Sequence, residues 1–149
     1  IEDGKRGSWM KKDAPLVVVI DGQGGMIGRK LCDQLLEGKP DLSLLALGTN
    51  SAATSAMLKG KAKQGATGEN PVLVAARRAA VIAGPASIVV ADSMLGEITP
   101  KMASAIGQSE AEKVLIPLNR CGILIAGVQD CPVDELIEKA AAMILKLIA

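Results

Sequence analysis

One stretch near the start of the chain constrains the fold more than any other. Residues 16–20 read Leu-Val-Val-Val-Ile, and an uninterrupted apolar run of this kind is typical of a parallel strand covered on both faces. A glycine-rich turn, Asp21–Gly28, follows directly. An amphipathic pattern then predicts a helix over residues 25–37. Strand, glycine turn and helix in this order predict the first βα unit of a parallel sheet.

The rest of the chain repeats this alternation. Apolar runs predict further strands at residues 42–47, 80–84, 114–116 and 123–128, and the less regular segment 61–69 contains a short expected strand near residues 64–67. Helical patterns lie at residues 52–59, 70–79, 100–106 and from the residue after Pro132 to the end. Residues 87–91 fit either a strand or an irregular loop. The alternation predicts an α/β fold with a doubly wound, mostly parallel sheet and helices on both faces, the Rossmann-like arrangement.

We expect a single Rossmann-like domain over residues 10–149. Residues 1–9 have no periodicity and end just before Met10, so we interpret them as an expression leader. No apolar run approaches the roughly 20 residues that span a bilayer, and no signal peptide precedes the first strand. Cys32, Cys121 and Cys131 form no paired motif. Reduced thiols in a cytoplasmic protein are the expectation.

The composition excludes several classes of function. From Met10 onward the chain has no His, Phe, Tyr or Trp. Without His, this chain alone builds neither a Ser-His-Asp triad nor an imidazole metal site. Without aromatic rings, it lacks the stacking platforms of RNA-binding and single-strand-binding proteins. A formal net charge of +1 gives no electrostatic case for nucleic acid or an anionic membrane as a partner.

Ligands of parallel sheets bind beyond the carboxyl ends of the strands, so the turns after the strands are the candidate sites. In the first turn, glycines let the backbone approach a ligand, and the N–H groups of the following helix face a phosphate. The candidate binding residues there are Gly22, Gln23, Gly24, Gly25, Met26 and Gly28. A tight turn without a ligand is the alternative interpretation.

A second candidate turn follows the second strand. Gly48, Thr49, Asn50 and Ser51 offer hydroxyl, amide and backbone donors to an anion at the start of a helix. The turn is similar to the phosphate-binding Gly-Thr turn of methylglyoxal-synthase-like domains. Helix capping alone is the alternative, but capping needs only one of these residues.

Polar residues at the same edge are weaker candidates for catalysis. Asp21, Asp92 or Glu97 could act as a base, or as a ligand of Mg²⁺ beside a phosphate. Asn119 could orient a substrate. Helix capping and surface hydrogen bonding are the alternative for these side chains, and we assign no residue to a metal.

The glycine turn resembles that of extended short-chain dehydrogenases/reductases, whose pattern is also GxxGxxG. Two features depart from that family. No acid follows the second strand, where Leu47 precedes Gly48–Ser51, and no Tyr is present for a Tyr-x-x-x-Lys pair. Hydride transfer by that mechanism is therefore excluded. The missing acid favours NADP, or a simpler phosphate ligand, over NAD.

A set of segments resembles a small bacterial family catalogued as domain of unknown function 3842. The segments are Ile-Asp-Gly-Gln-Gly-Gly at 20–25, Ala-Leu-Gly-Thr-Asn-Ser at 46–51, Gly-Ala-Thr-Gly-Glu-Asn at 65–70, Ser-Met-Leu-Gly-Glu-Ile-Thr-Pro at 93–100 and Ile-Pro-Leu-Asn at 116–119. The resemblance covers roughly residues 17–128. It implies a Rossmann-like fold and supports the choice of these segments, but it supplies no reaction.

The last predicted helix has an apolar face wider than one sheet contact requires. Its members are Leu136, Ile137, Ala140, Ala141, Met143, Ile144, Leu147 and Ile148. This face predicts a homo-oligomer interface, or else simply covers the sheet.

Three functions therefore stay open. The first is a module that binds a nucleotide, a dinucleotide or another small phosphorylated molecule. The second is a small metal-assisted enzyme that acts on a phosphorylated substrate. The third is a non-enzymatic oligomeric assembly protein.

Overall fold

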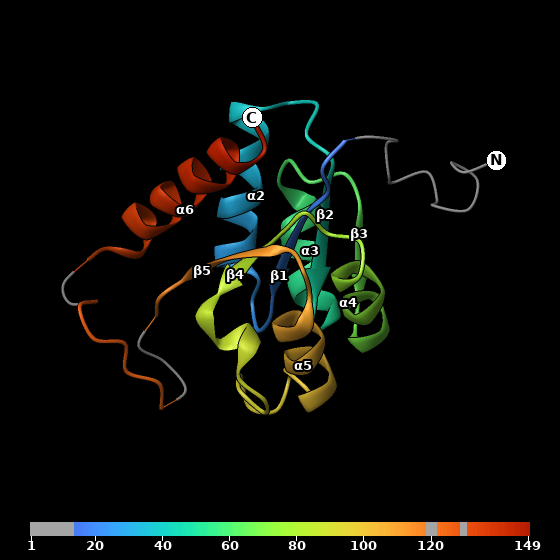
Figure 1. Ribbon diagram of the computed structural model, residues 1–149, viewed down its shortest axis with the longest axis vertical. Coiled ribbons are helices and arrows are strands. Elements are labelled where there is room, and N and C mark those ends of the chain that lie inside the picture. Colours follow the sequence, from blue (N-terminus) through green and yellow to red (C-terminus); the bar gives the residue numbers. More distant parts are fainter. Residues whose placement is uncertain (1–13, 119–121, 129–130) are drawn as a thin grey trace.

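The computed structural model of the chain describes residues 14–118, 122–128 and 131–149. Along the chain the elements are β1 (Val17–Asp21), α2 (Met26–Gly38), β2 (Leu44–Gly48), α3 (Ser51–Lys59), β3 (Gly65–Thr67), α4 (Glu69–Ala76), β4 (Val81–Pro85), the 3-10 helix η1 (Ala86–Val89), α5 (Pro100–Gln108), β5 (Glu112–Ile116) and α6 (Val133–Leu147). The five strands form one parallel sheet in the order β3-β2-β1-β4-β5 (Figure 1). The predicted α/β fold with a parallel, Rossmann-like sheet is confirmed.

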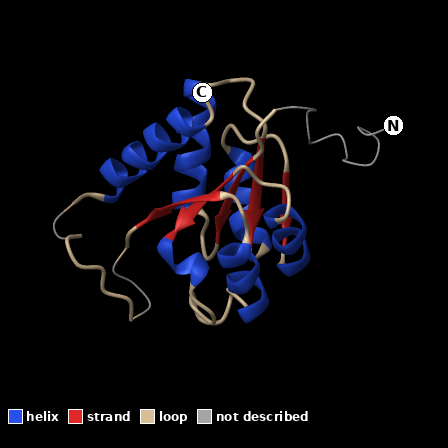
Figure 2. Ribbon diagram, in the orientation of Figure 1, coloured by secondary structure: helices blue, strands red, loops and turns tan. Residues whose placement is uncertain are grey.

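The central position of β1 explains why its first four residues, Val17 to Ile20, are all apolar. All five of its residues are buried. Val17 and Val19 pack on one side of the sheet with residues of α2, α3 and α6, whereas Val18 and Ile20 pack on the other side with residues of α4 and α5. Figure 2 shows the strands lying between helices. A strand covered on both faces has no solvated side on which polar residues would alternate.

The sheet order determines where a ligand could bind. From β1 the chain continues to β2 on one side, and later to β4 on the other side of β1. The direction of winding therefore reverses at β1, which is the usual position of ligands in open α/β sheets. We call the ends of β1, β2 and β4 at Asp21, Gly48 and Pro85 the carboxyl edge. Asp21 and Gly48 are direct partners in the register of β1 and β2.

One predicted strand is wrong. Residues 123–128 are irregular instead, with a turn at residues 126–127 in which the N–H of Val128 donates to the carbonyl oxygen of Ile125 at 3.3 Å. Gly122 and Gly127 adopt left-handed φ angles of 75° and 88°, which interrupt an extended backbone. Leu124 is 85% exposed, so this apolar run does not join the core.

Two further segments differ in detail. Helix α4 begins at Glu69, one residue before the expected start at Asn70, and Gly68 precedes it with a φ of 103°. It ends at Ala76, whereas the expected helix extended to residue 79. Residues 87–91, for which the sequence allowed either a strand or a loop, contain no strand. Their first residues belong to η1, which ends at Val89.

Residues 1–9 and Asn119 lie outside the described residues, so the predicted leader and the predicted role of Asn119 stay predictions. Within the described residues, no helix is long and apolar enough to cross a membrane.

Candidate functional site

The glycine turn is held by the carboxylate of Asp21, at the end of β1. Asp21 is only 4% exposed. Its Oδ1 accepts a hydrogen bond from the N–H of Gly22 at 2.8 Å, and its Oδ2 accepts one from the N–H of Gly28 at 2.7 Å. Gly28 lies in the first turn of α2, so this carboxylate ties the start of the helix to the end of the strand. We infer that Asp21 shapes the turn.

Three glycines of the turn are explained by packing. A Cβ atom at Gly25 would lie 2.6 Å from the carbonyl oxygen of Ala53 in α3, and its φ of 72° is left-handed. A Cβ at Gly28 would lie 2.6 Å from Sδ of Met57, and one at Gly22 would lie 2.5 Å from Sδ of Met94. At Gly25 the neighbouring atom is backbone, so a larger side chain is excluded whether or not a ligand binds. At Gly22 and Gly28 the neighbouring methionine side chain would have to move.

Gly24 is different from the other glycines of the turn. A Cβ atom there would meet nothing within 4 Å, and its φ lies outside the left-handed region. The fold therefore does not require glycine at this position. A missing side chain over an exposed turn leaves room for a ligand to approach the backbone closely.

The same turn carries backbone donors that are not used. Among the described residues, no acceptor receives the N–H groups of Gly24, Met26 and Ile27. The N-cap residue of α2, Gly25, has no side chain to cap the helix, and the first turn contains no acidic residue; the Asp21 carboxylate accepts the N–H of Gly28 there. Unused N–H groups and the positive end of the helix dipole together favour an anion at this position.

The second predicted turn contacts the first. Asn50 caps α3, because its Oδ1 accepts the N–H of Ala53 at 2.8 Å. Its Nδ2 donates to the carbonyl oxygen of Gln23 at 3.1 Å. Ser51 is exposed at the first residue of α3. Helix capping thus accounts for the Oδ1 atom of Asn50, whereas its Nδ2 atom links the second turn to the first.

Glu97 reaches both turns from the loop that follows η1. Its Oε1 accepts hydrogen bonds from the N–H of Gln23 at 2.9 Å, from Oγ1 of Thr49 at 2.5 Å and from Nδ2 of Asn50 at 2.7 Å. Burial alone would raise the pKa of Glu97, but these three donors outweigh it and hold the pKa below its ordinary value. Glu97 is therefore an anion at neutral pH.

Glu97 places a carboxylate at the end of β2, where the sequence has no acidic residue. No acid follows β2 along the chain, yet the carboxylate of Glu97 lies on Thr49 and Asn50 at the end of that strand. Sequence reasoning found Glu97 as a candidate but not these contacts, because no local pattern links residues so far apart.

Asp92, the other acidic candidate, starts the same loop and is exposed. Its backbone N–H donates to the carbonyl oxygen of Ile98 at 2.7 Å, so the two ends of the loop meet. Within the described part of the chain, no group of three or more His, Cys, Asp and Glu side chains could hold a metal ion. The catalytic roles suggested for Asp21, Asp92 and Glu97 stay predictions.

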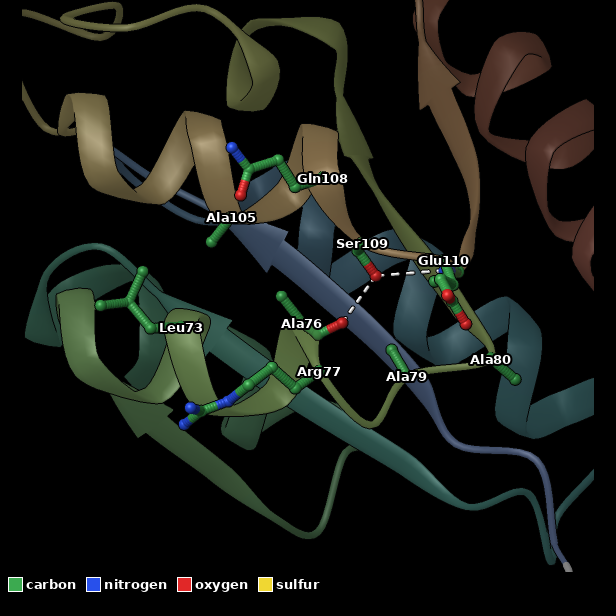
Figure 3. Close-up of a pocket in the computed structure, with 10 residues that line it drawn as sticks. Leu73, Ala76, Arg77, Ala79, Ala80, Ala105, Gln108, Ser109 and Glu110 are labelled. Atoms are coloured by element: carbon green, nitrogen blue, oxygen red, sulfur yellow. Dashed lines mark hydrogen bonds between the residues drawn. The ribbon is translucent and has the colours of Figure 1, made fainter.

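Sequence reasoning missed a cavity of about 690 Å³ at the opposite edge of the sheet, where β4 and β5 begin (Figure 3). Arg77 and Glu110 are the charged residues that line it. The hydroxyl of Ser109 is already used there, since it donates to the carbonyl oxygen of Ala76 at 2.6 Å and accepts the N–H of Ala111 at 3.1 Å. The carboxyl ends of α4 and α5 lie at this edge, so the helix dipoles disfavour an anion.

The fold and the carboxyl edge together define a Rossmann-like α/β domain with a glycine turn at the end of its central strand. The chain belongs to the family described as Domain of unknown function (DUF3842), whose family model matches residues 16–149. The resemblance seen in the sequence segments is thereby confirmed.

Other comparisons add little to the family match. No curated protein is significantly similar to the chain. One solved structure with a similar course of the chain is a dodecameric FMN-dependent UbiX-like decarboxylase from Escherichia coli O157:H7, at 16% identity and a TM-score of 0.44. The similarity covers 87% of this chain and 75% of that one. So distant a likeness assigns neither a ligand nor an assembly to this chain.

Proposed function

We propose that the carboxyl edge binds the phosphate group of a nucleotide or of another small phosphorylated molecule. The observation that carries this proposal is the set of unused N–H groups at Gly24, Met26 and Ile27, beside the open space over Gly24. They lie at the start of α2, a helix of 13 residues, which places the positive end of its dipole at the same point.

The second turn extends the proposed site. Thr49, Asn50 and Ser51 lie at the start of α3, next to Gln23. A ligand with two anionic or polar groups, such as a dinucleotide, would use both helix starts. NADP fits this description as one member of a wider class. Mg²⁺ beside a bound phosphate would take its carboxylate ligand from Asp92 or Glu97.

The test is binding of a panel of phosphorylated compounds, namely NADP, NAD, ATP and ribose 5-phosphate, each with and without MgCl₂. A ligand present at about 100 times its Kd stabilises the folded chain by about 3 kcal/mol, which raises the Tm by roughly 8 °C for a chain of this size. The proposal predicts such a shift for at least one of them, and none for adenosine or ribose. No shift with any compound, or equal shifts with and without phosphate, would contradict it.

A matched pair of glycine variants locates the site. Gly24→Val places a side chain over the unused donors, whereas Gly107→Val adds one at another open glycine, in α5. We expect the first to abolish the ligand-induced shift and the second to retain it. Retention of the shift in Gly24→Val would place the site elsewhere.

The ultraviolet spectrum offers a simpler check. The chain contains one Trp and no Tyr, so it absorbs little at 280 nm. A nucleotide retained during purification would therefore dominate the spectrum and could be identified by mass after denaturation.

A further inference from the structure

The carboxylate of Glu97 occupies donors that the proposed function assigns to a ligand. One of its oxygens, Oε1, receives the N–H of Gln23, the hydroxyl of Thr49 and the amide of Asn50. Phosphate oxygens in anion sites are bound in the same way, by backbone and side-chain donors that converge on one oxygen. An anion of the chain itself is therefore already bound at the junction of the two turns.

The loop that carries Glu97 is anchored at both ends and strained between them. Ser93 fixes one end, because its hydroxyl donates to the carbonyl oxygen of Ser87 at 2.6 Å, and the buried Ile98 fixes the other. In between, Met94 and Leu95 both have left-handed φ angles of 57°, which side chains rarely adopt. Leu95 at the tip is 98% exposed, whereas Met94 is only 5% exposed and packs in the core, so the least packed part of the loop starts at Leu95.

We propose that Glu97 is an internal competitor for the site: a phosphate must displace its carboxylate from Gln23, Thr49 and Asn50 before it can use them. This inference rests on the proposed function and adds its regulation. Two anions cannot share the same donors without strong repulsion. Because Ser93 and Met94 are buried on one side and Ile98 on the other, movement of residues 95–97 is enough to withdraw the carboxylate. Binding and loop release are then one coupled event.

The sign of a mutational effect tests this proposal. The probe is sodium pyrophosphate without divalent cations, titrated into the full chain by calorimetry. Glu97→Ala and Glu97→Gln both remove the competing charge, so we expect pyrophosphate to bind at least about tenfold tighter to each than to the unmodified protein. The ordinary expectation for a residue that contacts a ligand is the opposite, a loss of affinity.

Glu69→Gln is the matched control. Its carboxylate is also half-buried and accepts a threonine hydroxyl, that of Thr99 at 2.6 Å, but among the described residues it has no hydrogen bond with Gln23, Thr49 or Asn50. We expect its affinity for pyrophosphate to equal that of the unmodified protein. A Tm measured for every variant shows that each is folded, and the more conservative Glu97→Gln serves if Glu97→Ala is not.

Hydrogen exchange provides an independent readout in the unmodified protein. Saturating pyrophosphate should speed amide exchange of residues 95–97 as the loop is released. Unchanged or slower exchange would overturn the proposal, as would equal or weaker binding by both Glu97 variants. In those cases the proposed anion site survives as long as pyrophosphate binds the unmodified protein. If pyrophosphate binds neither the unmodified protein nor any Glu97 variant, both the site and the competition are refuted.

Discussion

Two acidic residues at the carboxyl edge have different tasks, and burial distinguishes them. Asp21 lies inside, with each oxygen on a backbone N–H of its own turn, so removing it would leave the N–H groups of Gly22 and Gly28 without those acceptors. Glu97 reaches the edge from a distant loop and joins two turns. Both were equal candidates in the sequence, because a carboxylate's partners are not visible from its neighbours along the chain.

The surroundings of Cys32, which include the carboxylate of Asp21, make its thiol unreactive. Burial raises the pKa of its thiol, and the nearby carboxylates of Asp33 and Asp21 raise it further. A thiol that stays protonated is a poor nucleophile. Cys32 lies in α2, and its side chain is fully buried in the core.

Glu97 should make stability depend on pH. Its pKa in the folded chain lies below the unfolded value of about 4.5, so its contribution is fully present above that pH and is lost as the pH falls through the folded pKa. We expect Glu97→Gln to lower the free energy of unfolding by about 1 kcal/mol at pH 7 and by less at pH 3. Urea denaturation at the two pH values measures this, and a difference that does not change with pH would contradict it.

At the scale of elements, the contact between α2 and α3 depends on one glycine. Gly25 lets the start of α2 approach the backbone of α3 at Ala53, with a left-handed φ. We expect Gly25→Ala to lower the free energy of unfolding by about 3 kcal/mol, because strain and a backbone clash combine.

Gly24→Ala is the neighbouring control for this prediction. It meets open space at an ordinary φ, so we expect its stability to stay within about 1 kcal/mol of the unmodified protein. Urea denaturation measures the free energy of unfolding of both variants. Equal destabilisation would contradict the packing difference between Gly24 and Gly25.

Elements with local signals were predicted well. Thr99 before Pro100 predicted the start of α5, and Thr99 does cap it, since its Oγ1 accepts the N–H of Met102 at 3.1 Å. The strands at the centre of the sheet lie within a residue or two of their predicted bounds. The strand predicted at residues 123–128 was wrong because it depended on non-local partners. An apolar run predicts a strand only where a neighbouring strand and a covering helix exist, and the run itself does not show whether they do.

At the scale of the whole molecule, α6 uses most of its apolar face within the chain. Ile137, Ala140, Ala141 and Ile144 are buried in the core on the side of α2. Met143 and Leu147 stay 56% and 50% exposed. The interpretation that this helix covers the sheet thus accounts for the buried part of the face, and the homo-oligomer stays a prediction about the remainder.

Light scattering measures that prediction directly. If a homo-oligomer forms through α6, we expect the double variant Met143→Lys, Leu147→Lys to have a lower molecular mass in solution than the unmodified protein. Leu124→Lys, at an exposed position on another segment, is the control and should leave the mass unchanged. A monomeric mass for the unmodified protein would exclude the oligomer.

The two edges of the sheet differ in their electrostatics because every strand runs the same way. α2 and α3 begin at the carboxyl edge, whereas α4 and α5 end at the other, beside the cavity of Figure 3. Their dipoles therefore favour anions at the first edge and disfavour them at the second. This polarity is a property of the parallel fold, and it supports the glycine turn, not the cavity at the other edge, as the anion site.

The sequence by itself determined the alternation of strands and helices, the parallel sheet and the glycine turn after β1. Those features depend on periodicity, caps and turn residues, which act over a few neighbouring positions. The tertiary structure alone decided that Glu97 meets Gln23, 74 residues away, and that Gly24 has no packing reason to be glycine. Such contacts follow from the strand order β3-β2-β1-β4-β5, which brings distant turns to one edge. No local pattern encodes them, because their energy comes from groups that meet only once the sheet has formed.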